Sequence, residues 1–280
     1  MTTTDIRPSP LAGQWYPADP EVLADSIDGY LSQADLPEIP GEILAVVTPH
    51  AGHRYSGPVA GYAFAALQGL KPELVVITSP MHQPYSEPIL TSGHDAYHTP
   101  LGDVPVDHEA LAFVKQAFQE KSGVDISSVK NDTEHSVEIE LPFLQRVIPT
   151  AFTLLPLMIR DQDQGLMRNL SEALGELLAS REGLLVASTD LSHFYSAEKA
   201  RQLDQTIIDA ILDLDPEAIY EAERKKEGFA CGKGGLAAVI WAGKQLGANQ
   251  AHHLKHGHSG EVTGDNARVV GYEAAVLTKD

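Results

Sequence analysis

Three histidines follow apolar segments at the points where strands would end. His50 closes "ILAVVTPH", His82 closes "LVVITSPMH" and His193 closes "LLVASTDLSH". In an open α/β sheet, ligand sites lie outside the carboxyl ends of the strands, so parallel strands would bring the three imidazoles to one edge. Neutral imidazole is the commonest transition-metal ligand in proteins. One such histidine alone is more often a polar residue satisfied at a strand end, but three together predict a metal site.

Two further segments place carboxylates and imidazoles near these positions. Asp190 lies three residues before His193, where a carboxylate could ligate a metal, act as a general base or hold an imidazole in one tautomer. A helix N-cap is an equally good interpretation of Asp190. Glu134 and His135 are adjacent and cannot share one helix face, so one could face a site while the other packs.

The chain has a single cysteine, Cys231, which precedes a glycine-rich turn and a predicted helix start in "ACGKGG". Backbone N–H groups at a helix start favour the thiolate, and Lys233 would add to this. A thiolate could be a soft metal ligand or, with His50 or His193 as the base, the nucleophile of a hydrolase. The alternative is a small buried hydrophobic residue. Because one cysteine cannot form an internal disulfide, we expect a reducing, cytoplasmic location.

The composition argues against several classes of partner. The 280 residues include 20 Lys and Arg against 39 Asp and Glu, a net charge of −19. Such a chain repels phosphate backbones, so we expect no nucleic-acid partner. No apolar run approaches the roughly 20 residues that cross a bilayer, and the first residues do not resemble a signal peptide. We therefore expect no membrane partner either.

The apolar patterning predicts helices that alternate with strands. Helices are expected at residues 20–34, 57–70, 107–121, 164–181 and 235–247, and as a pair within 197–227 that breaks at Pro216. Strands are expected at residues 43–48, 74–79, 152–159, 184–188 and 268–277. Most of these strands are continuous apolar runs, which are typical of a largely parallel sheet covered by helices on both faces. We expect one α/β domain over residues 1–280, with a hairpin insertion in 87–106 and a solvated loop at the histidine-rich "AHHLKHGHSGE".

Taken together, these segments resemble the Memo family (mediator of cell motility), which in microbes is called AmmeMemoRadiSam system protein B. The resemblance covers nearly the whole chain. The segments that carry it are, in order, "LAGQWYP", "PHAGHRYSG", "SPMH", "YHTPLGDVPVD", "EHSVEIELPFLQ", "STDLSHF", "ACGKG" and "SGEVTGDNARVVGYEAAV".

The resemblance implies a fold and a metal. The fold would be a three-layer αβα sandwich with a mostly parallel, mixed central sheet, as in LigB-type class III extradiol dioxygenases. The family's metal-binding positions correspond to His50, His82 and Cys231, and the metal would be iron or copper, with zinc as a further option. Those dioxygenases hold iron(II) with two histidines and a carboxylate, so a softer thiolate in the third position argues against ring cleavage of a catechol.

The resemblance also places Trp15, Asp190 and His193 among the other residues that line the pocket. Asp190 and His193 are expected to be catalytic, as acid and base groups or as supports for the ligands. Trp15, Tyr55, Glu134 and His135 are expected to bind substrate.

Two classes of function follow. One is a metal-dependent oxidoreductase, similar to a dioxygenase, with an unknown small-molecule or peptide substrate. The other is a binding or signalling module with a vestigial pocket, because the vertebrate member is described as a signalling protein that binds phosphotyrosine peptides. The microbial family name also implies Ammecr-type and radical-SAM partner proteins.

Overall fold

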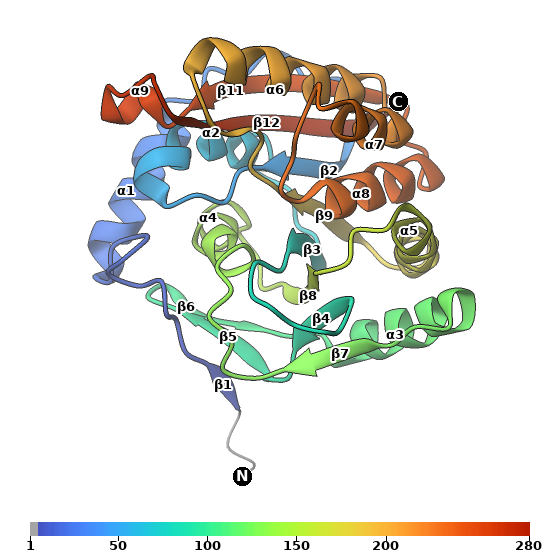
Figure 1. Ribbon diagram of the computed structural model, residues 1–280. Helices are drawn as coiled ribbons and strands as arrows, with labels where there is room; N and C mark the ends of the chain where they lie inside the picture. Colours follow the sequence, from blue (N-terminus) through green and yellow to red (C-terminus); the bar gives the residue numbers. More distant parts are fainter. Residues whose placement is uncertain (1–4) are drawn as a thin grey trace.

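The fold is built around one large mixed sheet, seen in a computed structural model that describes residues 5–280 (Figure 1). Its nine strands are β2 (Glu42–Thr48), β3 (Leu74–Pro80), β4 (Ile89–Ser92), β7 (Ile126–Val129), β8 (Thr153–Ile159), β9 (Gly183–Ser188), β10 (His193–Tyr195), β11 (Gln250–His258) and β12 (Val269–Lys279). They follow the order β10-β12-β2-β9-β3-β8-β4-β7, and β11 pairs with β12.

The middle of this sheet is parallel, and antiparallel pairs join it to the strands on either side. Strands β2, β9, β3 and β8 run parallel to one another. Strand β12 is antiparallel to β2, and β4 is antiparallel to β8. Every residue of β3 is buried, as its continuous apolar sequence predicts. The carboxyl ends of the four parallel strands therefore meet at one edge of the sheet.

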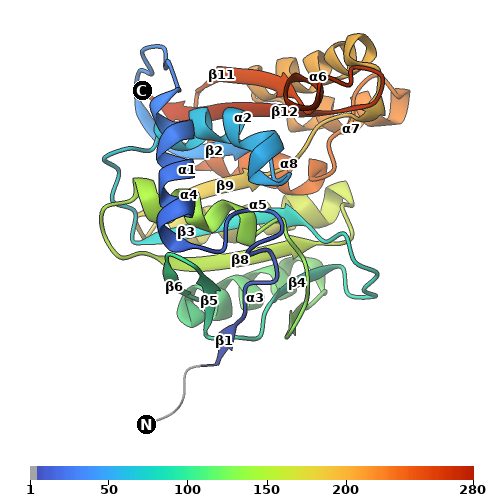
Figure 2. The same cartoon turned by 90° about the vertical axis from the view of Figure 1, so that its left-hand side faces the viewer.

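Helices cover both faces of the sheet (Figures 1 and 2). They are α1 (Pro20–Ser32), α2 (His53–Ala65), α3 (His108–Ser122), α4 (Leu141–Val147), α5 (Gln164–Leu178), α6 (Ala197–Leu212), α7 (Pro216–Lys225), α8 (Lys233–Gln245), α9 (Gly260–Thr263) and the 3₁₀ turn η1 (Glu138–Glu140). Residues of β2 alternate between two cores: Val46 packs with α1, α2 and α4, whereas Ala45 and Val47 pack with α3, α5 and α8. This confirms the expected three-layer sandwich. Within the described residues, none of these helices is both long and apolar enough to cross a membrane.

A second, smaller sheet contains the predicted hairpin. It consists of β1 (Ile6–Arg7), β5 (Ala96–Thr99) and β6 (Gly102–Pro105). Strands β5 and β6 form the antiparallel hairpin expected within residues 87–106, and β1 pairs with β5 in parallel. Strand β4, which precedes the hairpin, belongs to the large sheet instead.

The prediction of a solvated loop for the histidine-rich segment is wrong. Residues 250–258 form β11, antiparallel to β12. The segment is too polar to show the apolar pattern of a strand. Its imidazoles are accommodated in the fold because they pair with buried carboxylates. His253 Nδ1 is 2.7 Å from Oε1 of Glu273 on β12, and His256 Nε2 is 2.9 Å from Oδ2 of Asp204 on α6. Both carboxylates are completely buried.

A buried arginine joins the N-terminal segment to the loop that precedes η1. Arg7 is 1% exposed, and its guanidinium donates to both carboxylate oxygens of Asp132 and to Oε2 of Glu138. It also donates to the carbonyl of Glu134 at 2.8 Å. The other Glu138 oxygen accepts from the Tyr16 hydroxyl at 2.7 Å. The network thus connects residues more than 120 positions apart in the chain.

Arg7→Met should destabilise the protein severely. Removing one partner of a buried ion cluster leaves its carboxylates unpaired, which typically costs about 3–5 kcal/mol. Urea unfolding would measure the loss. The matched control is Arg146→Met, which breaks the exposed ion pair with Asp28 and should cost less than about 1 kcal/mol. Equal effects of the two substitutions would contradict the structural role of Arg7.

The Glu273–His253 pair should make stability fall as pH rises. Burial raises the pKa of Glu273 to about 7. Ionisation of this carboxyl is therefore less favourable in the folded protein, and the free energy of unfolding falls as pH rises from its unfolded pKa of about 4.3 to about 7. The pKa of His253 is raised by its hydrogen bond with Glu273. The stability that the protonated imidazole contributes is therefore also lost as pH rises. Glu273→Gln removes both effects. Relative to wild type, the variant should gain about 1–3 kcal/mol of unfolding free energy between pH 4.5 and 8, and the exposed-site control Glu38→Gln should not.

Candidate functional site

The loops that follow the parallel strands deliver the predicted histidines to one cavity. His50 lies two residues after β2 and His82 two residues after β3, while His193 begins β10, which follows β9. All three line a cavity of about 730 Å³ together with Asp190 and His135. The convergence expected from the strand ends is therefore confirmed.

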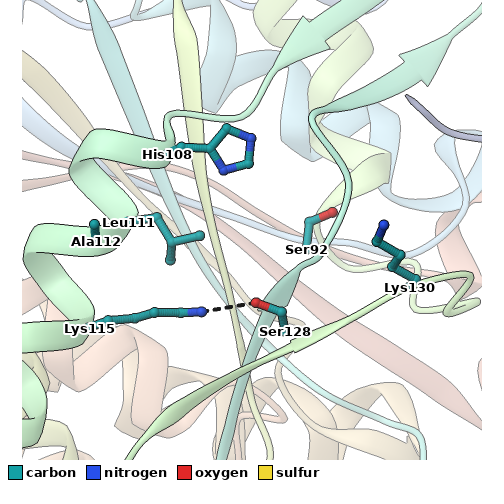
Figure 3. A pocket seen from close by; sticks show the side chains of 8 residues that line it. Ser92, His108, Leu111, Ala112, Lys115, Ser128 and Lys130 are labelled. Carbon is teal, nitrogen blue, oxygen red and sulfur yellow. Dashed lines mark hydrogen bonds between the residues drawn. The ribbon is translucent and has the colours of Figure 1, made fainter. Parts of the chain in front are cut away.

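Another cavity, of about 630 Å³, lies between α3 and strands β4 and β7 (Figure 3). There Lys115 donates to the hydroxyl of Ser128 at 2.9 Å. Lys130 pairs with Asp5, and His108 pairs with Asp95. Its charged groups are thus already engaged, and it holds no strand-end histidine, so we place the candidate site in the first cavity.

Three imidazoles form a compact cluster. Nitrogens of His50, His82 and His135 all lie within 4.8 Å of one another. The ring centroids of His82 and His135 are 4.5 Å apart, and each is 5.3 Å from that of His50. Nitrogens bound to one tetrahedral ion at about 2.1 Å would lie about 3.4 Å apart. Small movements of the rings toward one another would let the cluster hold an ion.

Hydrogen bonds orient His50 toward the cavity. Its Nδ1 is 3.0 Å from the hydroxyl of Ser188, which itself lies within donating distance of Glu140 and of the Ser136 carbonyl. With its single hydrogen used there, the hydroxyl accepts from Nδ1–H and leaves Nε2 of His50 unprotonated. Burial, with the nearby imidazoles of His135 and His82, lowers the pKa of His50 well below its usual value. His50 is therefore a neutral donor group for a metal.

One carboxylate lies beside the other two imidazoles and is hydrogen-bonded to the ring of His82. Oε1 of Glu134 is 2.9 Å from Nδ1 of His82 and 3.2 Å from Nδ1 of His135, and Oε2 accepts from the His82 backbone N–H. Burial alone would raise the pKa of Glu134, but the hydrogen bond from His82 and the neighbouring imidazoles hold it well below its usual range. An ionised carboxylate behind a ligand is typical of metal sites, and here it leaves Nε2 of His82 free.

The predicted substrate-binding residues take different places. Trp15 and Tyr55 line the mouth of the cavity, and the Trp15 ring packs on His135 with centroids 4.4 Å apart. His135 also lines the cavity. Glu134 does not: its side chain is completely buried behind His82. Of this adjacent pair, one residue faces the cavity and the other packs, as expected. The buried position of Glu134 does not support the expected contact with substrate.

Asp190 connects the loops of the site instead of capping a helix. Its Oδ1 accepts from the backbone N–H of His50 at 2.9 Å, and its own N–H donates to Sγ of Cys231. Burial raises the pKa of Asp190 to about 7. The Nδ1 of His193 donates to the carbonyl of Leu191 at 2.7 Å, so its Nε2 is free to face the cavity. The helix-cap interpretation of Asp190 is wrong.

Cys231 contacts the histidine cluster at His50. Its Sγ lies 3.2 Å from Nε2 of His50. Burial, with the neighbouring Asp190, raises the pKa of the thiol above its usual value. Lys233, expected to favour the thiolate, pairs with Glu223 instead. The predicted ligand set of two histidines and Cys231 remains a prediction, beside a second possible set in which His135 takes the third place.

Sequence reasoning missed several groups that belong to the site. They are the buried supports Ser188 and Glu140 and the cavity-lining residues Arg54, Phe194, Arg268 and Tyr272. Arg54 stands in "PHAGHRYSG", four residues after His50, and Arg268 and Tyr272 stand in "NARVVGY". The sequence signal for these residues was their place in two of the segments that carry the family resemblance.

Comparison with known proteins identifies chains similar to this one. The sequence model of one family, described as Memo-like protein, matches residues 7–276. A MEMO1 family protein of Nitrosopumilus maritimus is 34% identical over 273 residues, which cover 96% of this chain and 98% of the relative. One of Methanopyrus kandleri is 37% identical over 285 residues, 98% of this chain and 99% of the relative. An uncharacterized Escherichia coli K12 protein, with a TM-score of 0.50 and 14% identity, covers 83% of this chain and 99% of its own, and shares the fold alone.

The buried imidazoles should stay neutral in mild acid. Burial lowers the pKa of His135 to about 4 and places that of His50 well below its usual value. In metal-free protein labelled at histidine, the ¹⁵N resonances of these two rings should therefore not titrate between pH 8 and 5.5. Spectra of His50→Gln and His135→Gln would assign the signals. Titration of either ring near pH 6.5 would contradict the described geometry.

Proposed function

This chain belongs to the Memo-like family, and from that premise we propose that its histidine cavity binds one redox-active metal ion, iron or copper, to carry out an oxidoreductase reaction on a small substrate. The observation that carries the proposal is the histidine cluster itself. Three imidazole nitrogens lie within 4.8 Å of one another, and buried oxygens of Glu134 and Ser188 contact the opposite ring nitrogens. Buried oxygen partners that fix imidazole tautomers in this way are typical of metal ligands.

His50, His82 and Cys231 are the proposed ligands. The 3.2 Å between Sγ of Cys231 and Nε2 of His50 is close to the roughly 3.5 Å expected between a sulfur and a nitrogen bound to one ion. Two imidazoles and a thiolate suit copper(I), zinc or thiolate-tolerant iron. The ring of His135 packs on that of Trp15, with centroids 4.4 Å apart, and its nitrogen offers an alternative third ligand.

The ion would supply Lewis-acid and redox chemistry, and the chain's own residues would manage protons and position the substrate. Asp190, with its pKa raised to about 7 by burial, can take up or release a proton near neutral pH. His193 presents Nε2 from the neighbouring loop. Trp15 and Tyr55 offer partly exposed aromatic faces at the mouth, against which a flat or apolar group would pack.

The partner proteins implied by the resemblance remain predictions. Ammecr-type and radical-SAM proteins would use the product of this site or supply its substrate. Co-purification from a native host, with one of the three proteins as bait, would test the association. Recovery of neither partner under conditions that preserve known complexes would count against it.

Metal content gives the decisive test of the proposed function. Tag-free protein, purified without oxygen and analysed by mass spectrometry, should carry about one iron or copper per chain. His50→Ala/His82→Ala should carry none, because loss of ligands removes several kcal/mol of binding free energy. The exposed-site control His98→Ala should retain the metal. Wild-type protein that can be neither isolated with metal nor reconstituted would overturn the proposal.

The same assay identifies the third ligand. Cys231→Ser should lose far more affinity than Asp190→Asn, because a group that supports a ligand typically changes affinity only about 10–100-fold. Glu134→Gln should fall in the same range as Asp190→Asn. A larger loss in His135→Ala than in Cys231→Ser would assign the third place to His135.

A further inference from the structure

The segment between β9 and β10 is fixed to β12 by two backbone hydrogen bonds. The N–H of Leu191 donates to the carbonyl of Gly271 at 2.8 Å, and the N–H of Gly271 donates to the carbonyl of Ser192 at 2.8 Å. Leu191 and Ser192 are both completely buried. The segment carries Asp190 before these two residues and His193 after them. The positions of both site residues therefore follow from this attachment to β12.

A buried carboxylate lies behind this attachment. Asp204 is on α6, which packs against β10, β11 and β12 (Figure 1), and its side chain is completely buried. Its Oδ1 accepts from the N–H of Ser192 at 2.9 Å, and its Oδ2 is 2.9 Å from Nε2 of His256 on β11. One carboxylate therefore connects the histidine-rich strand to the segment that ends at His193.

Gly271 leaves the space that this carboxylate fills. A Cβ atom at position 271 would lie 2.6 Å from Cγ of Asp204, far inside van der Waals contact, so no larger residue fits there unless Asp204 moves. The backbone of Gly271 thus holds the segment, and its missing side chain lets Asp204 reach the N–H of Ser192.

The ring of His193 is oriented by the same segment. Its Nδ1 donates to the carbonyl of Leu191 at 2.7 Å, so the ring follows the position of the residues that β12 and Asp204 hold. The next residue, Phe194, has a φ of 64°, in the left-handed region that bulky residues rarely adopt. Such a conformation persists only where the surrounding structure over-determines the backbone. The hydrogen bond from Ser192 to Asp204 is one of the contacts that do so, two residues before Phe194.

An apolar side chain would fill the place of Asp204 at a lower free-energy cost. Burying a carboxylate is unfavourable unless it is hydrogen-bonded, and apolar residues pack in a core without that penalty. The other buried positions of α6 are indeed all Ala, Leu or Ile. What the carboxylate adds over an apolar side chain is two directed hydrogen bonds, and directed bonds fix the positions of the groups that they join.

We propose that Asp204 is a positioning residue for His193, and that His256 holds the Asp204 carboxylate in place. Neither Asp204 nor His256 lines the cavity, so both act on it through Ser192. With Nδ1 bound to the carbonyl of Leu191, Nε2 of His193 is free to take a proton from a bound substrate or to give one. The use of that nitrogen in a reaction rests on the proposed function, whereas the placement of the ring does not.

The tautomer of His193 tests this proposal. In metal-free protein labelled with ¹⁵N at histidine, the neutral His193 ring of wild type should carry its proton on Nδ1 only, and His193→Gln assigns its signals. In Asp204→Ala the hydrogen bond to Leu191 should be lost, and the ring should become a mixture of both tautomers. Asp204→Asn should keep the wild-type spectrum, because its amide oxygen can still accept from Ser192. A His193 ring that stays protonated on Nδ1 alone in Asp204→Ala would overturn the proposal.

Glu273→Gln is the matched control. Glu273 is also a completely buried carboxylate paired with a histidine of β11, His253. The His193 signals of this variant should be those of wild type, and so should the His50 signals of Asp204→Ala. A change of the His193 tautomer as large in Glu273→Gln as in Asp204→Ala would make the effect a general one of altered β11 and would overturn the proposal.

His256→Ala keeps the test decisive if Asp204→Ala does not fold. The side chain of His256 is 18% exposed, so its truncation should be tolerated. Loss of its hydrogen bond should produce the same mixture of His193 tautomers to a smaller extent. An unchanged His193 ring in this variant would remove His256 from the proposal and, where Asp204→Ala has not folded, overturn it.

Titration with iron(II) and copper(I) separates this inference from the proposed function. Wild type and Asp204→Asn should bind these ions with equal affinity. A protein that binds no metal but whose His193 tautomer depends on Asp204 would retain this inference and lose the proposed function. A protein that binds metal but whose His193 tautomer is independent of Asp204 would do the reverse.

Discussion

The buried guanidinium of Arg7 is the contact on which the site depends, although it lies outside the cavity. It donates to Asp132, to Glu138 and to the carbonyl of Glu134, all on the segment that carries His135. Glu138 also accepts from the Tyr16 hydroxyl, next to Trp15. Charges buried without partners are costly, so the chain is stable only when these segments meet. The same network that satisfies the charges therefore sets Trp15 against His135.

Parallel strands supply the other half of the site. The ends of β2, β3 and β9 lie next to one another because these strands pair in register. Asp190 then ties two of the loops together, since its carboxylate accepts from the N–H of His50 and its carbonyl accepts from the N–H of Cys231 at 3.1 Å. The donor atoms are thus held by the most deeply buried part of the sheet, and the groups behind them, Glu134 and Ser188, determine which imidazole nitrogen remains free.

Electrostatics differ between the site and the rest of the protein. The acidic surface favours solubility and repels large polyanions. Inside the cavity, burial keeps the imidazoles of His50 and His135 neutral, and the guanidiniums of Arg54 and Arg268 line the same cavity. Neutral imidazole nitrogens in a buried cavity suit the binding of a metal cation.

The sequence by itself determined the layered α/β fold and the meeting of His50, His82 and His193, because apolar runs identify buried strands and parallel strands end at a common edge. The family followed from a different signal, the resemblance of motifs in order along the chain. Only the tertiary structure decided that His135 joins the cluster while Glu134 lies buried behind His82, since adjacency in sequence does not show which side chain turns inward. Strand β11 was hidden for a related reason: its histidines are satisfied by Glu273 and Asp204, distant in sequence. Contacts of that range, like those of Arg7, leave no periodic pattern in the chain and are set when its layers pack together.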